Sequence, residues 1–317
     1  MASATVEEAE FIRIFQQNGA AETAKILNMS VRAVYKRRKG LERAMGRVIV
    51  SPNNKAVLNY NPSYPQRLGL EVDTGIVVIA SDAHYWPERI SAAHRALVRF
   101  CKEYQPKAVI MNGDVFDGAS ISRHPPIGWE QSPTVEEELG AAGERLAEIF
   151  DAAPNAEKVW TLGNHDARFE TRLATVAPQY AGVKGVHLKD HFAEWKPCWS
   201  IWINDEVVVK HRFKGGIHAT HNNTLWAGKT MVTGHLHSLK VTPFSDYNGT
   251  RWGVDTGTLA GIDPMGPQFA DYLEDNPVNW RSGFAVLTFH HGRLLWPELV
   301  HVISATEVEF RGKVHEV

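Results

Sequence analysis

The chain has 317 residues, enough for one large domain with a small appendage, and its 44% hydrophobic and 22% charged residues are ordinary for a folded soluble protein. Only two cysteines occur, Cys101 and Cys198, and they form no C-x-x-C pair, which argues against a zinc site built from thiolates. The longest apolar runs have the length of strands, and the N-terminus lacks the basic start and apolar run of a signal peptide. We therefore expect a cytoplasmic protein without a membrane span.

The net charge of −2 is unevenly distributed along the chain. Residues 1–50 contain nine Lys and Arg against five Asp and Glu, a net charge of +4. The remaining residues contain 25 Lys and Arg against 31 Asp and Glu, a net charge of −6. A small basic segment on an acidic body favours contact between that segment and a polyanion.

The basic segment is predicted to be helical. Two helices are expected over residues 6–17 and 20–27, and Ser30 can cap a third helix that follows. Asn28 suits the tight turn before it, because Asn tolerates a left-handed backbone. The pattern resembles a helix-turn-helix, so we expect a small all-α DNA-binding domain over residues 1–48. The candidate DNA-contacting residues are Arg32, Lys36, Arg37 and Arg38. The alternative is a solvated basic helix in a three-helix packing module.

Residues 49–73 are rich in Pro and Asn and are predicted to be a linker. A second domain is expected over residues 74–317, where strand-like and helix-like segments first alternate and strands then predominate. Its predicted strands are 76–81, 108–112, 158–162, 200–203, 206–210, 230–234, 251–255, 284–289 and 294–302, and its predicted helices are 91–104 and 135–150. The continuous apolar runs fit strands that are covered on both faces. This pattern favours an α/β fold, and a two-sheet α/β sandwich over one purely parallel sheet.

Polar residues able to bind metal follow five of the predicted strands, which is where open α/β sheets place their sites. These blocks are Asp82-Ala83-His84, Gly113-Asp114-Val115-Phe116-Asp117, Gly163-Asn164-His165-Asp166, the single residue His211, and Gly234-His235-Leu236-His237. Their order resembles the calcineurin-like metallophosphoesterase family, whose pattern is D-x-H, G-D-x-x-D, G-N-H-[DE], a lone His and G-H-x-H. The resemblance covers roughly residues 74–305.

The resemblance implies the sandwich fold of that family and a pair of divalent cations. The implied ligands are Asp82, His84 and His237 for the first metal, Asp114 for the bridge, and Asn164, His211 and His235 for the second metal. One carboxylate must bridge two cations that lie roughly 3.5–4 Å apart. Carboxylate, imidazole and amide ligands suit Mn²⁺, with Fe, Zn or Ni as alternatives.

The resemblance also implies roles for residues that are not ligands. His165 is similar to the family's catalytic His, placed to protonate the leaving oxygen or to stabilise the transition state. Asp166 is expected to fix the ring of His165 and keep it protonated, and Asp117 to orient a ligand. His211 is the preferred fourth-block ligand because it directly follows a strand, and His221 is the alternative.

Two loops contain candidate substrate-binding residues. The long loop 118–134 carries Arg123, His124 and Trp129, which could clamp a phosphate and stack on a base. Arg212 follows His211 directly and could contact a phosphate backbone. Ordinary packing of the first loop and a solvated turn in the second are the alternatives.

The catalytic blocks do not specify which phosphoester is hydrolysed. The basic N-terminal segment favours a phosphoester in nucleic acid, above all in DNA, because phosphate contacts by Arg and Lys give salt-sensitive affinity. We therefore expect a two-metal DNA endonuclease or exonuclease that resembles phage-type members of the family. The alternatives are a small-molecule or nucleotide phosphodiesterase or phosphatase, and a DNA-binding regulator with a vestigial metal domain. The intact run 164–166 argues against the regulator, because a structural site needs no catalytic His.

Overall fold

The computed structural model describes residues 7–45, 49–52, 64–124, 129, 131–261 and 278–317. The chain forms two compact units, residues 1–63 and residues 64–317, and each is described by itself.

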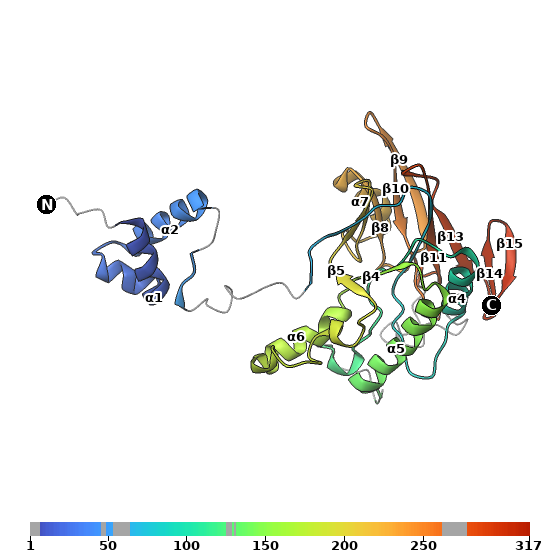
Figure 1. The fold of residues 1–317 in the computed structure, drawn as a ribbon, viewed down its shortest axis with the longest axis horizontal. Helices are drawn as coiled ribbons and strands as arrows, with labels where there is room; N and C mark the ends of the chain where they lie inside the picture. The colour runs from blue at the N-terminus through green and yellow to red at the C-terminus, as the bar shows by residue number, and fades with distance from the viewer. Residues whose placement is uncertain (1–6, 46–48, 53–63, 125–128, 130, 262–277) are drawn as a thin grey trace. The chain divides into compact units, whose positions relative to one another are not determined.

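The first unit contains helices α1 (Glu8–Ile26) and α2 (Val31–Met45) (Figure 1). Gly19, with φ 75°, interrupts the helical backbone inside α1 between the two helices predicted there. Asn28 has φ 50°, and the Oγ atom of Ser30 accepts a hydrogen bond of 3.1 Å from the backbone N–H of Ala33. The predicted left-handed turn and the predicted cap of the last helix are therefore confirmed. Buried apolar side chains from both helices and from the segment after them form the core: Phe11, Phe15, Ala24, Val34, Leu41 and Ile49.

The second unit contains two sheets, as predicted, and both are mixed. In the described residues the six-stranded sheet has the order β1 (Leu68–Leu70), β6 (Ile201–Ile203), β7 (Val207–Val209), β8 (Thr230–Thr233), β10 (Gly249–Asp255) and β9 (Lys240–Asp246). The nine-stranded sheet has the order β15 (Lys313–Glu316), β14 (Glu307–Phe310), β13 (Glu298–Val302), β11 (Gly283–His290), β2 (Gly75–Ala80), β3 (Ala108–Met111), β4 (Glu157–Thr161) and β5 (Lys196–Cys198), and β12 (Arg293–Leu294) pairs with β11.

The central strands of the nine-stranded sheet are buried on both faces. Along β2, Val78 and Ala80 face one apolar cluster, whereas Val77 and Ile79 face another. The first cluster also contains side chains of helices α4 (Ala92–Tyr104) and α5 (Val135–Ala152), and the second contains side chains of both sheets. Because successive strand residues point to opposite faces, one continuous apolar run fills both clusters. This confirms the sandwich.

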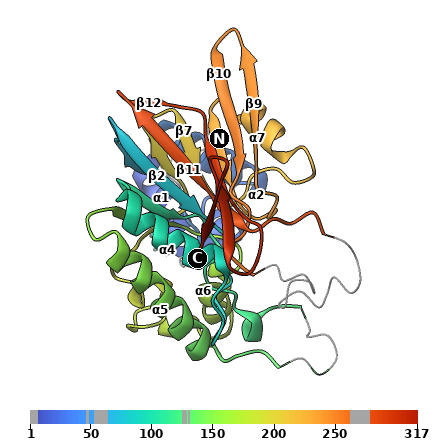
Figure 2. The ribbon, with the colours of Figure 1, turned by 90° about the vertical axis from the view of Figure 1, so that its right-hand side faces the viewer.

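Helices cover the outer faces of the two sheets. Helices α4 and α5 lie side by side against the nine-stranded sheet (Figures 1 and 2). Helix α7 (Ala219–Ala227) packs on β8, β9 and β10, and the hairpin of β9 and β10 projects beyond it (Figure 2). The remaining helical segments in the described part of this unit are α6 (Asp166–Val176) and the 3₁₀ turns η2 (Ala119–Ile121), η3 (Pro178–Tyr180) and η4 (Leu188–Asp190). No helix in the described ranges has the length and apolarity needed to cross a bilayer.

Two details of the predicted organisation are corrected. Strand β1 lies inside the predicted linker 49–73 and pairs in parallel with β6, and Tyr64 is buried, so the end of that stretch belongs to the second unit. The predicted strand 294–302 is divided into β12 and β13. Pro297 lies between them and has no backbone N–H to donate to a neighbouring strand.

Candidate metal centre

The candidate ligands follow strands that are neighbours in the two sheets. Strands β2, β3 and β4 are adjacent and parallel in the nine-stranded sheet, and β7 and β8 are adjacent and parallel in the six-stranded sheet. The carboxyl ends of parallel strands meet at one edge. The blocks that contain Asp82, Asp114 and Asn164 therefore leave one sheet side by side, and those that contain His211 and His235 leave the other.

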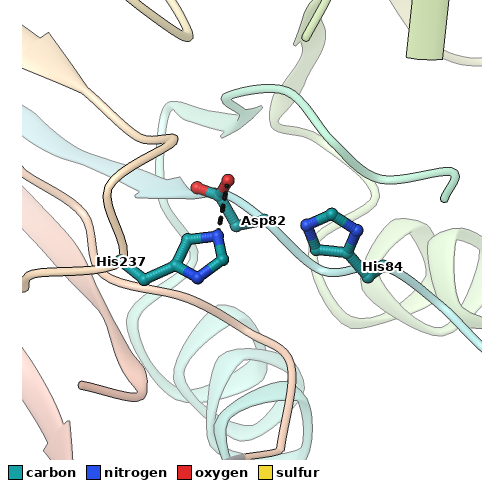
Figure 3. A group of neighbouring side chains, drawn as sticks. All are labelled: Asp82, His84 and His237. Carbon is teal, nitrogen blue, oxygen red and sulfur yellow. Dashed lines mark hydrogen bonds and ion pairs between the residues drawn. The ribbon is translucent and has the colours of Figure 1, made fainter. Parts of the chain in front are cut away.

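The first candidate ligand group consists of Asp82, His84 and His237. Their ligand atoms all lie within 4.8 Å of one another, and all three side chains are buried. The Nε2 atom of His237 lies 3.1 Å from Oδ1 of Asp82. Figure 3 shows the two imidazole rings on either side of this carboxylate. One carboxylate and two imidazoles thus converge on one point between the two sheets.

The second candidate group consists of Asp114, His211 and His235. The Nε2 atom of His211 lies 3.0 Å from Oδ2 of Asp114 and 3.9 Å from Oδ1 of Asp82, so the two groups are adjacent. The Nδ1 atom of His211 donates to the backbone oxygen of Asn112 at 2.8 Å, which directs Nε2 toward the carboxylates. Of the two alternatives for this block, the structure brings His211 to the group. His221 is exposed, and the centre of its ring lies 5.5 Å from that of Phe244.

Two buried polar atoms in the centre have no hydrogen-bond partner among the described residues. They are Oδ1 of Asn164 and Nδ1 of His237. A buried polar atom without a partner is costly, so such atoms require a cause. Carboxylate, imidazole and amide donors directed at a common space fit divalent cations, and the side chains present therefore fit a metal pair.

The backbone around the ligands is constrained in two ways. Five candidate ligands have left-handed φ angles, namely Asp82 at 54°, His84 at 42°, Asp114 at 52°, His235 at 71° and His237 at 55°. Such strained residues persist only where the surrounding structure enforces them, and they cluster at functional sites. The motif glycines also have no room for a side chain. A Cβ atom on Gly163 would lie 2.0 Å from Oδ1 of Asp114, and one on Gly113 would lie 2.3 Å from Nδ1 of His211.

The charges of the centre are strongly coupled. Burial raises the pKa of Asp114, but the neighbouring imidazoles, His211 foremost, hold it well below its ordinary value. Burial lowers the pKa of His211, but Asp114 and Asp82 outweigh this effect and raise it to about 10. The two carboxylates thus stabilise a positive charge at Nε2 of His211. A cation bound there would supply that charge and release the proton.

The position of Asp166 corrects one expectation. Its carboxylate does not fix the ring of His165 but accepts hydrogen bonds from four backbone N–H groups and from the Trp160 indole. The backbone donors belong to Asp114, Val115, Phe116 and Gly163, at 2.8–3.1 Å. Asp166 begins α6, and its side chain points back at the loop after β3. It therefore holds the loop that carries Asp114.

Asp117 takes the role that was expected of Asp166. Its Oδ1 atom lies 2.8 Å from Nδ1 of His165 and 2.7 Å from Nδ1 of His84. One carboxylate thus orients both a candidate ligand and the candidate catalytic imidazole. Burial lowers the pKa of His165, but the hydrogen bond to Asp117 and the charge of Asp114 outweigh this effect and raise it.

Arg168 is a residue that the sequence analysis missed. It donates from one guanidinium nitrogen to Nε2 of His165 at 3.1 Å and from another to the backbone oxygen of Asp117 at 3.0 Å. His165 also belongs to a third possible ligand group, with His84 and Asp114. Since both of its ring nitrogens already have protein partners, a ligand role would require one of these to leave. Arg168 lies three residues after His165 at the start of α6, and that helical spacing was the available signal.

The predicted substrate residues lie at the surface. Arg123 and His124 are exposed next to each other, and Trp129 is 100% exposed. The structure records no contact of these three side chains with a candidate ligand in the part of the chain that it describes. Arg212 is exposed but close to the centre. Burial lowers the pKa of His235 most, and the charge of Arg212 lowers it further.

The predicted DNA-contacting residues of α2 fall into two pairs. Arg32 and Lys36 are exposed. Arg37 and Arg38 are half-buried, with their guanidinium groups 4.7 Å and 5.6 Å from the ring centres of Phe11 and Phe15. The second pair therefore contributes to the packing of α2 on α1.

The chain matches the calcineurin-like phosphoesterase family over residues 76–255, more than half of its length. It is similar to the gene 54 proteins of Mycobacterium phages L5 and D29, with 26% identity over 253 residues that cover 70% of this chain and 92% of each relative. Among solved structures it is similar to an archaeal phosphodiesterase, with 15% identity, a TM-score of 0.35 and coverage of 72% of this chain and 99% of that chain. It is also similar to Yfce, a phosphoesterase from E. coli, with 14% identity, a TM-score of 0.33 and coverage of 70% and 97%. The family expected from the five blocks is thereby confirmed, and the chain belongs to the calcineurin-like phosphoesterases.

Proposed function

We propose that the protein is a two-metal phosphodiesterase that hydrolyses nucleic acid, with DNA as its substrate. The observation that carries this proposal is the adjacency of two candidate ligand groups, 3.9 Å apart between His211 and Asp82, with a further imidazole at their border. Two neighbouring cations suit an in-line displacement at phosphorus, because they stabilise the attacking and the leaving oxygen together.

Each cation would be held by side chains of both sheets. The residues that would hold the pair, with Mn²⁺ as the preferred metal, are Asp82, His84, Asp114, Asn164, His211, His235 and His237. When bound, two such cations lower the pKa of a water molecule and stabilise negative charge on phosphoryl oxygens.

His165 would give the leaving oxygen its proton. Asp117 accepts from Nδ1 of His165 and fixes the ring, which leaves Nε2 as the atom that faces the substrate. In the neutral ring Nε2 accepts a hydrogen bond from Arg168. A proton on Nε2 turns this acceptor into a donor and releases the guanidinium, which is then available to a phosphoryl oxygen.

An exposed surface beside the metal centre favours a polymeric substrate. Phe213 is 43% exposed and Trp226 is 71% exposed, and the Nζ atom of Lys214 lies 5.5 Å and 4.5 Å from their ring centres. Arg212, Phe213 and Lys214 come directly after His211, and Trp226 belongs to α7. Aromatic faces interleaved with cations bind single-stranded nucleic acid without sequence preference. The exposed Arg32 and Lys36 of α2 would add phosphate contacts.

The test compares single- and double-stranded DNA with bis(4-nitrophenyl) phosphate and 4-nitrophenyl phosphate, using the full chain with Mn²⁺. We expect cleavage of DNA that chelation abolishes. In the variant Arg32→Gln/Lys36→Gln, DNA affinity should fall and the slope of log affinity against log salt should become shallower by about two. The matched control is Arg13→Gln/Lys25→Gln, which removes two cations of α1 that are paired with Glu10 and Glu22.

The alternative is a small-molecule phosphodiesterase, and the cleft described below is large enough for such a ligand. Activity confined to the small esters and equal in both double variants would decide for that alternative and against the DNA substrate.

A further inference from the structure

A cleft of about 930 Å³ opens beside the metal centre on the side of the first ligand group. His84 and Trp280 are among its lining residues. The ring centre of Trp280 lies 4.4 Å from that of His237, with the rings edge to face. The cleft is thus lined by one candidate ligand of the first metal and by a tryptophan whose ring contacts another. Its volume is at the upper end of the ~300–1,000 Å³ that is usual for small-molecule sites.

The lining of this cleft is cationic. It contains Arg89, Arg95 and Arg281, and none of the described residues that line it is acidic. Neither Arg95 nor Arg281 forms an ion pair with any carboxylate in the described ranges. This concentration of positive charge lies on a body whose net charge after residue 50 is −6, and it favours an anionic ligand.

The same cleft offers flat apolar surfaces. Trp86 and Trp280 are half-buried lining residues, and Ile90 and Leu259 also line it. The guanidinium of Arg89 lies 5.9 Å from the ring centre of Trp86. Indole faces stack with nucleobases of any sequence, and arginines bind phosphate. A ligand with an aromatic body and a phosphate matches this lining.

One wall of the cleft is held in place by hydrogen bonds. Arg95 of α4 donates to the backbone oxygen of Ile90 at 2.9 Å and also to that of Ala305. Its guanidinium therefore joins the segment before α4 to the segment after β13, and both segments line the cleft. A site that is formed before binding loses less entropy when the ligand enters.

We propose that this cleft is a nucleotide subsite, which holds the nucleoside and phosphate next to the scissile bond on the His84 side of the metal centre. Trp86 and Trp280 stack on the base, and Arg281 and Arg89 bind the phosphate. This inference rests on the proposed function and extends it, because it assigns recognition of the neighbouring nucleotide to side chains that are not ligands.

The test uses two esters with one leaving group. Thymidine 5′-(4-nitrophenyl phosphate) carries a nucleoside, and methyl 4-nitrophenyl phosphate does not. For the Mn²⁺-loaded full chain, the ratio of kcat/KM between the two esters should fall about tenfold in Trp86→Leu and about tenfold in Arg281→Gln, mainly through KM of the thymidine ester. The matched controls are Trp296→Leu and Arg293→Gln, which change exposed residues outside the cleft and should keep the wild-type ratio.

A second measurement does not depend on turnover. Titration of the metal-free full chain with thymidine 5′-monophosphate should quench tryptophan fluorescence, and Arg281→Gln should raise the dissociation constant about tenfold. An equal dissociation constant in Arg281→Gln, or a kcat/KM ratio that neither cleft variant changes, would overturn the subsite. The proposed function fails separately, if the wild-type chain prefers the thymidine ester but leaves DNA intact.

Discussion

The two sheets contribute different chemistry to the candidate metal centre. The nine-stranded sheet provides both carboxylates and the amide, from Asp82, Asp114 and Asn164, together with the imidazole of His84. The six-stranded sheet provides imidazoles alone, from residues 211, 235 and 237. One sheet thus supplies all the carboxylates among the candidate ligands, and the other would complete the coordination. We expect neither set to hold two cations by itself, so the candidate metal centre depends on the packing of the two sheets.

The residues that each sheet contributes form one half of the site, which we call the nine-stranded half and the six-stranded half. The two halves also differ in how firmly neighbouring groups hold their side chains. On the nine-stranded side, Asp166 accepts backbone hydrogen bonds from the loop after β3, and Asp117 orients His84 and His165. On the six-stranded side, His211 is buried and bonded to a carbonyl, whereas His235 is exposed. The nine-stranded half is therefore the rigid part of the site. Variants in this half should separate metal binding from catalysis most clearly.

The largest effect is expected from the shared carboxylate. Asp114→Ala should lose metal and reduce turnover by more than about a thousandfold, because two cations ~3.5–4 Å apart then repel each other without a bridging anion. Elemental analysis after dialysis and kcat on bis(4-nitrophenyl) phosphate measure both quantities. Asp151→Ala, at an exposed aspartate of α5, is the control and should retain metal and turnover. Full metal content in Asp114→Ala would contradict the role of Asp114 as the shared carboxylate.

The next effect separates catalysis from metal binding inside the same half. His165→Ala should keep its metal and lose turnover by about 10²–10⁴-fold, since both ring nitrogens of His165 are engaged by protein groups and general acid catalysis accounts for about that factor. The same two measurements apply. Metal loss as complete as in Asp114→Ala would make His165 a ligand and would sink its assignment as the proton donor.

The fold and the grouping of the candidate ligands were predictable from the sequence because both depend on local patterns. Apolar runs of strand length identified the central strands, and each block of candidate ligands follows the end of a strand within two or three residues. The strands that were missed, such as β9 and β14, are partly exposed at sheet margins and lack a continuous apolar run. Strand β1 is only three residues long and lies in a Pro-rich stretch, so composition gave no sign of its pairing with β6.

The partner of His165 was not predictable because it depends on side-chain direction in three dimensions. Asp166 is adjacent in sequence, yet its side chain lies at the start of α6 and points back at the loop after β3. Asp117, 48 residues earlier, comes within 2.8 Å because β3 and β4 are neighbours in the sheet. The arginines that line the cleft likewise come from segments that are far apart in the sequence, since Arg89 and Arg95 precede Arg281 by more than half of the chain. No local sequence pattern therefore predicted that they lie together.

The contact between the two halves can be tested at one glycine. A Cβ atom on Gly234, which follows β8, would lie 2.6 Å from Oδ2 of Asp82 and 2.5 Å from Oγ of Ser81. Gly234→Ala should therefore push the sheets apart at the first metal and weaken metal affinity by about 10–100-fold, as is usual when supporting contacts of ligands are disturbed. Competition with a metal indicator dye measures this affinity. Gly215→Ala, where a Cβ atom meets open space, is the matched control. Equal affinity in the two variants would mean that this close approach is not needed.

The smallest effect concerns the support of the nine-stranded half. Glu138 of α5 is buried, and its carboxylate accepts hydrogen bonds from the backbone N–H groups of Gly118 and Ala119, in the loop that follows Asp117. Burial raises the pKa of Glu138 to about 7, from an ordinary value of 4.5, although the Gly118 N–H opposes this shift. The folded protein therefore holds this proton more tightly than the unfolded chain. The resulting stabilisation is complete below pH 4.5 and is lost as the pH rises through 7.

Glu138→Gln removes this titration and keeps a neutral side chain of the same length. The free energy of unfolding of the wild type, minus that of the variant, should fall by on the order of 2–3 kcal/mol between pH 4.5 and pH 8. Denaturant unfolding at both pH values gives the difference, and Glu136→Gln, at an exposed position of the same helix, should show no such change. A difference that stayed constant over this range would mean that folding does not raise the pKa of Glu138. Its carboxylate would then be ionised in the folded protein at neutral pH, and the loop beside Asp117 would be held by a buried charge.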